Sequence, residues 1–309
     1  MKFVSFLNPD DSETPYLGCP YLGVLDGEII EDFGIEAGDV LIQILGAGRT
    51  DVKGLRWYLE QYAVKRQLSE VELKAPLPFP VSLRDFNVFE NHMKTAYNIA
   101  GREIPAAWYD MPFFHFINHT SIYGPGETIT FPGKIKELDF ELEIACVIGK
   151  EGRDIHAKQA EEYVMGYMIF NDWSARDIQR LEVSIGFGPT KSKDFASSFG
   201  PYLVTPDELE DRTTGRVGVY DLEMTARIND QEVSRGNWKN MHYSFGEMIA
   251  HASEGATLKP GDVLGSGPIS SGCLFETTNG KGPWLQPGDI VELEVERLGV
   301  LVNTVGEIE

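Results

Sequence analysis

Hydrophobic and polar positions alternate over many short stretches of this chain, and few stretches repeat with the spacing of a helix. Alternation predicts strands, because successive side chains of a strand point to opposite faces. The alternating stretches are TITFPG, FELEIACVIGK, YMIFND, PYLVT, VYDLEMTARIND, DVLGSG and DIVELEVERLGVLVNTV. Helical spacing is clearest at 157–165 and 244–254. Strands this close together predict a mostly β sandwich or roll and argue against a doubly wound parallel sheet.

The first 75 residues or so have a different pattern, which predicts a small α+β unit. Two alternating segments flank an LDGE turn of the kind found in hairpins, and residues 51–67 have helical spacing. Prolines at positions 76, 78 and 80 then require an extended crossing that no helix can continue through. We therefore predict a small N-terminal α+β domain at 1–75 and a larger domain at 76–309.

Composition and charge narrow the classes of partner. The chain has 309 residues, enough for a large core, and a formal net charge of −21. Nucleic acid and anionic membranes would repel it, so neither is an expected partner. Cys19, Cys146 and Cys273 are far apart, which predicts reduced thiols in a cytoplasmic protein. No signal-peptide core or apolar segment of about 18 residues occurs, so we expect a soluble, unanchored protein.

The stretch DFELEIACVIGK, residues 139–150, carries two acids on a strand whose faces are both expected to be buried. Period two places Glu141 and Glu143 on one face, followed by small apolar residues, and large apolar residues on the other. The two Cβ atoms would lie roughly 6.5–7 Å apart, so both carboxylates can converge on one ion. Alternatively, this end of the strand is solvated and the acids face water. Two buried like charges without compensation would be costly.

A second polar group follows the apolar run YVMGYMIF. Asp172 stands at the predicted strand end, with Arg176 and Gln179 four and seven residues later. If a helix starts there, the three side chains share one face, and the latter two supply donors for a carboxylate or keto oxygen. The alternative is an acid at a helix N-terminus that simply pairs with an arginine one turn later.

A third acidic position lies just after the predicted domain boundary. Asp85, in SLRDF, precedes a helix predicted from about residue 88, and His92 lies within that helix. A single histidine on a helix is otherwise a packed or hydrogen-bonded residue. This segment therefore indicates a functional site only in combination with the other two segments.

Together the three segments resemble the fumarylacetoacetate hydrolase family. The stretch ELDFELEIACVIGK is similar to the metal-binding ExE strand of that family, and FNDWSARDIQ is similar to its NDWSARDIQ segment. KSKDFASSFGPYLV and SGPISSGCLFE are similar to two further segments, the second of which ends in a glutamate. The resemblance runs from roughly Pro80 to the C-terminus. It implies an α+β, mostly β fold, with a mixed β-sandwich or roll catalytic domain of the family's type.

The resemblance also implies a divalent cation held by carboxylates. Its ligands would be Glu141, Glu143 and Asp172, with Asp85 as the fourth. Oxygen-only donors suit Mg²⁺, Mn²⁺ or Ca²⁺ better than Zn²⁺, which prefers His and Cys. We expect Mg²⁺. The strand would then carry acids inward because a hard cation neutralises them there.

The remaining site residues take their expected roles from the same resemblance. His92 would be the general base that activates water, with Glu276 orienting its ring. Lys193 would stabilise developing negative charge. Arg176 and Gln179 would hold the substrate.

The chain departs from the family pattern in three places. The segment between Asp172 and Lys193 is one residue longer than in the family pattern, which makes Lys191 a second candidate for the role of Lys193. Pro268 stands where a threonine is found in the family, which removes a hydroxyl donor. His115 and His119 stand where other members have different residues, so the rim of the pocket is not transferable.

The implied activity is hydrolysis of a carbon–carbon bond in an acylpyruvate or β-diketo acid of the fumarylacetoacetate or fumarylpyruvate type, through a metal-bound enolate. The alternative at the same metal site is oxaloacetate decarboxylation or keto–enol tautomerisation. A cation-stabilised binding protein without catalysis is a third reading, which the presence of His92, Lys193 and Glu276 disfavours. The expected partners are a small oxo acid and, by resemblance, a second copy of the chain in a homodimer.

Overall fold

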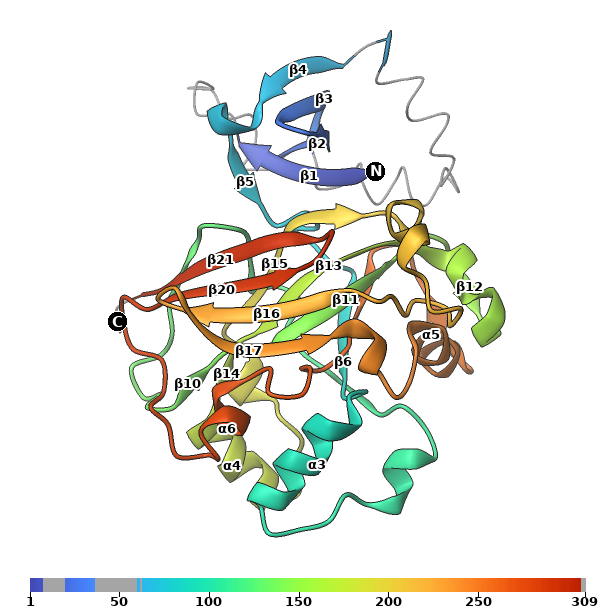
Figure 1. The fold of residues 1–309 in the computed structure, drawn as a ribbon. Helices are drawn as coiled ribbons and strands as arrows, with labels where there is room; N and C mark the ends of the chain where they lie inside the picture. Colours follow the sequence, from blue (N-terminus) through green and yellow to red (C-terminus); the bar gives the residue numbers. More distant parts are fainter. Residues whose placement is uncertain (8–19, 37–59, 62, 307–309) are drawn as a thin grey trace.

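Two β-sheets packed against each other make up most of the fold (Figure 1). The computed structural model describes residues 1–7, 20–36, 60–61 and 63–306. Helices lie at the ends and edges of the sheets. This is the mostly β architecture that the closely spaced alternating segments predict.

The larger sheet has 12 strands. They are β1 Lys2–Leu7, β2 Tyr21–Asp26, β3 Ile29–Glu36, β4 Val64–Gln67, β5 Glu72–Lys74, β6 Ser82–Phe86, β7 Phe114–Phe116, β8 Ile122–Tyr123, β11 Leu142–Ile148, β13 Val164–Asp172, β15 Ser197–Val204 and β19 Asp262–Gly265. The order is β4-β3-β2-β1-β15-β13-β11-β19-β6-β7, with β5 beside β1 and β8 beside β15. The pairs β19–β6 and β15–β8 are parallel, and the others are antiparallel.

The second sheet has five strands and covers one face of the first. They are β9 Thr128–Ile129, β16 Glu223–Ile228, β17 Gln231–Asn237, β20 Ile290–Val295 and β21 Gly299–Val305. Their order is β17-β16-β20-β21-β9. Two small sheets complete the strands: β10 Leu138–Asp139 pairs with β14 Ser174–Ala175, and β12 Gly152–Arg153 with β18 Thr257–Leu258.

The described helices are short. The α-helices are α3 Glu90–Ile99, α4 Arg176–Ser184, α5 Phe245–Ser253 and α6 Leu274–Thr277, and the 3₁₀ helices span Leu68–Glu70, Ala106–Tyr109, Ala157–Tyr163, Lys191–Lys193, Pro206–Arg212 and Trp238–Asn240. The predicted helix at 244–254 is confirmed as α5, which Ser244 and Glu247 cap reciprocally. The prediction for 157–165 is wrong at its end, because Val164 already belongs to β13. No described helix is long and apolar enough to cross a bilayer.

Strand β11 is buried on both faces, as the period-two pattern predicts. Alternate side chains from Phe140 to Ile148 enter the core that the two sheets share. Ala145 and Val147 point the other way, into a second core that includes Phe3. Each large apolar side chain buried in this way contributes about 1.5–3 kcal/mol, so the strand is held firmly from both sides.

The N-terminal strands continue the larger sheet, since β1 pairs with β15. The hairpin β2–β3 turns at Gly27, with φ of +59°, which confirms the turn predicted at LDGE. The helix predicted for 51–67 falls mostly outside the described residues. Its last four residues contradict the prediction, because Val64–Gln67 pair with β3 as a strand. The domain boundary after residue 75 stays a prediction.

Helices α3, α4 and α6 gather at the end of the molecule away from β1–β5 (Figure 1). The end of β6, the beginning of β11 and the end of β13 meet at this same end, because β11 runs antiparallel to both β13 and β19 while β19 runs parallel to β6. These three strand ends and the three helices therefore lie at the same end of the molecule.

Candidate metal centre and active site

Four carboxylates meet where three strands of the larger sheet come together. Asp85 belongs to β6, Glu143 to β11 and Asp172 to the end of β13, and Glu141 directly precedes β11. One oxygen of each residue lies within 4.8 Å of the corresponding oxygens of the others. All four side chains are buried. The four acids that the resemblance assigned to a cation are thus neighbours in space, although they come from three separate segments.

The absence of a side chain at Gly265 makes room for these acids. Strand β19 runs between β6 and β11, and Gly265 pairs with Asp85 on one side and with Ala145 on the other. A Cβ at this position would lie 2.8 Å from Oδ1 of Asp85 and 2.7 Å from the ring of Phe170. The strand that separates two of the acids therefore leaves a shared space between them.

Two oxygens of the cluster are left without a protein partner. Within the described part of the chain, Oε1 of Glu143 and Oδ1 of Asp172 are buried and accept no hydrogen bond. The backbone N–H of Gly267 donates to Oε2 of Glu143 at 2.8 Å and to Oδ1 of Asp85 at 3.2 Å. Buried carboxylate oxygens are costly unless a donor or cation approaches them. This all-oxygen donor set fits a hard divalent cation such as Mg²⁺, Mn²⁺ or Ca²⁺.

Burial and mutual repulsion change how these acids titrate. Burial, followed by the charge of Asp172, raises the pKa of Asp85 well above its ordinary value, and burial followed by Asp85 does the same to Glu143. Burial raises the pKa of Asp172 to about 6, although Lys193 opposes the shift. Burial also acts on Glu141, but Lys193 in particular more than offsets it and holds the pKa below its ordinary value. A further cation at the cluster favours ionisation of all four acids together.

Lys193, and not Lys191, is the lysine inside the site. The Lys193 side chain is 3% exposed, and its Nζ donates to Oε2 of Glu141 at 2.6 Å and to Oδ2 of Asp172 at 2.5 Å. Burial opposes its charge, but Asp172 and Glu141 more than offset this and raise its pKa. Lys191 is exposed, pairs with Asp194 at 2.5 Å and does not line the cavity.

His92 and Glu276 form a buried pair next to the cluster. Nδ1 of His92, on α3, lies 2.8 Å from Oε2 of Glu276, on α6. The carboxylate fixes the orientation of the ring and leaves Nε2 as the nitrogen that can accept a proton. Oε1 of Glu276 is buried and has no partner among the described residues.

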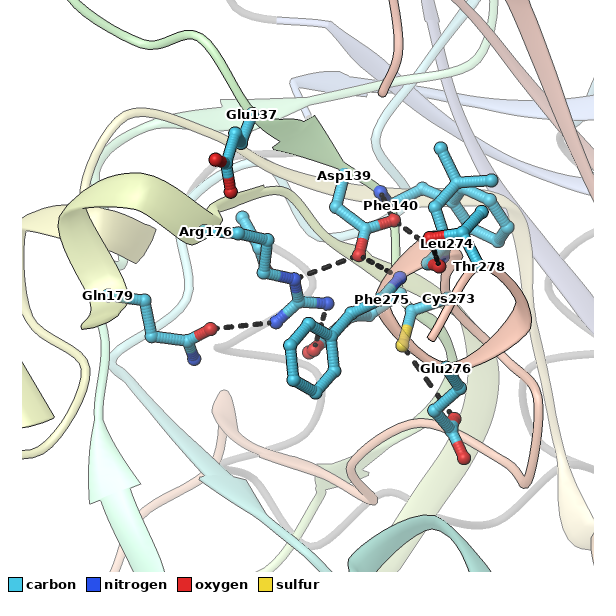
Figure 2. A network of polar contacts seen from close by, with 12 residues as sticks. Glu137, Asp139, Phe140, Arg176, Gln179, Cys273, Leu274, Phe275, Glu276 and Thr278 are labelled. Carbon is cyan, nitrogen blue, oxygen red and sulfur yellow. Dashed lines mark hydrogen bonds and ion pairs between the residues drawn. The ribbon is translucent and has the colours of Figure 1, made fainter. Parts of the chain in front are cut away.

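Arg176 connects several polar groups at the start of α4. Its Nε donates to Oδ2 of Asp139 at 2.8 Å, its Nη2 to Oε1 of Glu141 at 2.8 Å and its Nη1 to Oε1 of Gln179 at 2.9 Å (Figure 2). The expectation that Asp172 shares the helix face with these residues is wrong, because it ends β13 before the helix begins. Asp172 reaches the site from the strand.

The sequence analysis missed Asp139. This buried carboxylate holds Arg176 and also accepts the backbone N–H groups of Leu274 and Phe275, at 2.7 and 2.9 Å (Figure 2). Period-two alternation extended backwards from Glu141 would have placed it on the same face. Its effect is to join α4 and α6 near the cluster.

A cavity of about 610 Å³ opens onto these residues. Its polar lining includes Asp85, His92, His115, Glu141, Arg176, Gln179 and Lys193. One wall is apolar and consists mainly of Met93, Ala96, Tyr97 and Ala100, with Val183 and Phe275 nearby on the lining. Met93, Ala96 and Tyr97 stand at positions i, i+3 and i+4 of α3, and Ala100 follows at i+7 as its C-cap. One apolar face of α3 is therefore directed at the cavity.

The two histidines expected at the rim lie in different places. His115 lines the cavity, and its Nε2 lies 3.9 Å from Oδ2 of Asp85. Burial, followed by the charge of Lys193, lowers the pKa of His115 to about 4, so the ring is neutral at neutral pH. His119 is exposed and does not line the cavity. Pro268 is buried and is not part of the lining either.

Comparison with known proteins gives consistent matches. The family model described as fumarylacetoacetate (FAA) hydrolase C-terminal matches residues 84–306. The human protein named oxaloacetate tautomerase FAHD2A, mitochondrial, is 30% identical over 312 residues, which cover 99% of this chain and 91% of that protein.

Two solved structures have similar folds. A fumarylacetoacetate hydrolase from Exiguobacterium antarcticum aligns over 99% of both chains, with a TM-score of 0.74 and 26% identity. The maleylpyruvate hydrolase of Sphingobium sp. SYK-6, in complex with manganese(II) and pyruvate, aligns over 100% of both chains with a TM-score of 0.72. Its identity is 22%, so this second likeness concerns the fold alone.

Proposed function

The chain belongs to the fumarylacetoacetate hydrolase family, and on that premise we propose that it is a metal-dependent hydrolase that cleaves a carbon–carbon bond of an acylpyruvate or related β-diketo acid. The family consists of enzymes that include hydrolases and tautomerases, so membership supports an enzyme without selecting the reaction. We choose hydrolysis because of the volume of the cavity and the residues that line it.

One observation carries this choice: His92, which pairs with Glu276, and the apolar wall of α3 line the same cavity of about 610 Å³. Two acids of the carboxylate cluster, Asp85 and Glu141, line that cavity too. Cavities of about 300–1,000 Å³ accommodate ligands of drug size, and a four-carbon oxo acid fills little of that space. An acylpyruvate has an oxo-acid end that suits the cation site and an acyl arm that suits the apolar wall.

We assign the cation to the four clustered carboxylates, Glu141, Glu143, Asp172 and Asp85, with Mg²⁺ as the first candidate. When bound, the cation supplies positive charge that polarises the two oxygens of an oxo acid and stabilises negative charge left on the pyruvate part. Lys193 donates hydrogen bonds to two of these carboxylates and keeps them ionised and oriented.

The proposed chemistry at the other end of the cavity begins with water. His92, held by Glu276, takes a proton from a water molecule at Nε2, and the water oxygen attacks the acyl carbonyl carbon. The bond between that carbon and the pyruvate carbon then breaks. The pyruvate part receives the proton, so the products are a carboxylic acid and pyruvate. Arg176 and Gln179 line the cavity and hold the oxo-acid end.

The human relative favours a second candidate, because it matches almost the whole chain and its name states oxaloacetate tautomerase. Tautomerisation moves one proton between carbon and oxygen and needs no water, and His92 is placed to carry that proton. Decarboxylation of oxaloacetate requires the same cation site. Both reactions use a small substrate, so the apolar wall would have no part in them.

The deciding experiment is a substrate panel of acylpyruvates and oxaloacetate, assayed with Mg²⁺ and again with EDTA. We expect hydrolysis of acylpyruvates that EDTA abolishes. His92→Ala should lower it by about 10²–10⁴-fold, and His119→Ala, an exposed histidine outside the cavity, should leave it unchanged. Activity on oxaloacetate alone would remove the hydrolase proposal, and cation binding without turnover of any oxo acid would favour a binding protein.

We also propose a homodimer that acts in the cytoplasm. The dimer rests on the family resemblance, and light scattering that shows a monomer at micromolar concentration would refute it. The human relative is named as mitochondrial, and the free thiols of Cys146 and Cys273 suit either reducing compartment. Fractionation of cells that express the tagged protein distinguishes the two locations.

A further inference from the structure

A buried thiol lies beside the His92–Glu276 pair and has no part in the proposed reaction. Cys273 directly precedes α6, and its Sγ points toward Glu276, 3.7 Å from Oε2 (Figure 2). One ligand atom each of His92, Cys273 and Glu276 lies within 4.8 Å of the other two. All three side chains are buried. A nitrogen, a sulfur and an oxygen donor therefore converge next to the cavity.

This donor set differs in kind from the neighbouring carboxylates. Hard cations such as Mg²⁺ prefer oxygen ligands, whereas imidazole and thiolate are the ligands of Zn²⁺ and similar ions. Zinc sites in enzymes typically have three protein ligands and one position open to water. Glu276 also retains a buried oxygen, Oε1, that has no partner in the described part of the chain. A free ligand atom thus remains even while the pair with His92 is intact.

We propose that His92, Cys273 and Glu276 form a second cation site that binds Zn²⁺ and thereby inhibits the enzyme. Zinc–sulfur and zinc–nitrogen bonds of about 2.3 and 2.0–2.1 Å require ligand atoms roughly 3–4 Å apart in a tetrahedral site. The present distances of 2.8 Å between Nδ1 and Oε2 and 3.7 Å between Sγ and Oε2 are close to that spacing. Because His92 lines the cavity, the ion can enter from there, and a water molecule completes its shell.

Binding of the ion inhibits the enzyme because it changes which nitrogen of His92 carries a proton. This step rests on the proposed function, in which His92 is the base. The ion takes the place of the proton between Nδ1 of His92 and Oε2 of Glu276. That proton moves to Nε2, which then no longer accepts one from water. The thiol of Cys273 releases its proton to solvent as the thiolate binds the ion. Binding Zn²⁺ therefore blocks the base without displacing the cation of the carboxylate cluster.

The site is expected to bind more strongly as pH rises. The sulfur of Cys273 binds the ion as a thiolate, so the thiol first has to lose its proton. The ion has to displace that proton, and each proton released favours binding at higher pH. Mg²⁺ has little affinity for thiolates, so it does not compete for this position.

A binding experiment tests the site without reference to activity. Co²⁺ is added to the full-length protein saturated with Mg²⁺, and near-ultraviolet absorption is followed, because a thiolate bound to Co²⁺ gives a charge-transfer band. The band is expected in the wild type and in Cys146→Ser, whose buried thiol lies in β11 and is not among the three grouped ligands. Cys273→Ser and Cys273→Ala are expected to lack it. A band that persists in both variants, or never forms in the wild type, overturns the proposal.

A second measurement uses only the wild type and so does not depend on the folding of variants. Crystals soaked in Zn²⁺ are expected to show anomalous scattering between His92, Cys273 and Glu276, whereas zinc found only on the carboxylate cluster overturns the proposal. In assays, each variant is compared with its own rate without zinc. Cys273→Ser is expected to raise the inhibitory Zn²⁺ concentration by at least about tenfold. An ion bound at the site without inhibition would instead count against His92 as the base.

Discussion

Replacement of Lys193 by methionine tests the electrostatics of the whole cluster. Methionine has a similar length and is apolar, so Lys193→Met removes a buried charge with little change in volume. The change breaks two buried ion pairs at once, to Glu141 and to Asp172. Without a cation, both buried carboxylates then lose a hydrogen-bonded partner, although Glu141 keeps its pair with Arg176.

The expected magnitude follows from the burial of all three groups. Removing one partner of a buried ion pair costs about 3–5 kcal/mol, because the other charge stays buried and unpaired. At about 2–4 °C per kcal/mol for a domain of this general size, the Tm of the metal-free protein should fall by roughly 6–20 °C. A divalent cation supplies charge at the same place, so saturating Mg²⁺ should recover most of that loss.

The assay is thermal unfolding of wild type and variant in EDTA and in saturating Mg²⁺, with Lys191→Met as the matched control. Among the described residues, the side chain of Lys191 forms an ion pair only with Asp194, and such an exposed pair is worth about 0–1 kcal/mol. The Tm of Lys191→Met should therefore barely move. Isothermal titration should also show that Lys193→Met binds Mg²⁺ more tightly, because a repelling charge is gone. An equal fall in Tm with and without Mg²⁺, or no fall at all, would refute the reasoning.

Two further predictions concern protons and substrate size. Burial raises the pKa of Asp172 to about 6 and those of Asp85 and Glu143 well above their ordinary values. The protonated acids therefore stabilise the metal-free protein at low pH, and the part that Asp172 contributes is lost as pH rises through about 6. A cation binds the ionised forms, so the gain in Tm on adding Mg²⁺ should increase from about pH 5 to about pH 7.5, and a constant gain would contradict this. Ala96→Trp should fill the apolar part of the cavity and lower kcat/KM for long-chain acylpyruvates by at least about tenfold while sparing acetylpyruvate. An equal effect on both substrates would show that the wall does not contact the acyl arm.

The shared face of Glu141 and Glu143 could be predicted from the sequence because side chains alternate regularly along a strand. Period two fixes the face on which Glu141 and Glu143 lie, and the apolar runs on either side show that the strand is buried. The same rule could not show that Asp85 joins them, since that depends on which strands are neighbours. The resemblance to a family supplied this information, and the parallel pairing of β6 with β19 accounts for it.

Other features depend on tertiary contacts that no local pattern reveals. Residues 64–67 have helical spacing but form a strand, because pairing with β3 satisfies their backbone groups and outweighs propensity. The apolar stripe of α3 is visible in the sequence, yet spacing alone does not say whether it faces a core or a cavity. Asp139 matters because it accepts hydrogen bonds from the backbone at Leu274 and Phe275, more than 130 positions away in the chain.

The route of the chain through the larger sheet determines when the protein can first capture an ion during folding. Gly267, which donates to Asp85, is 182 positions from it in the sequence, so closing this contact requires the ordering of a very long loop. Such distant pairings form late and slowly. In a refolding experiment, we therefore expect fully folded chains to bind the ion and partly folded chains not to bind it.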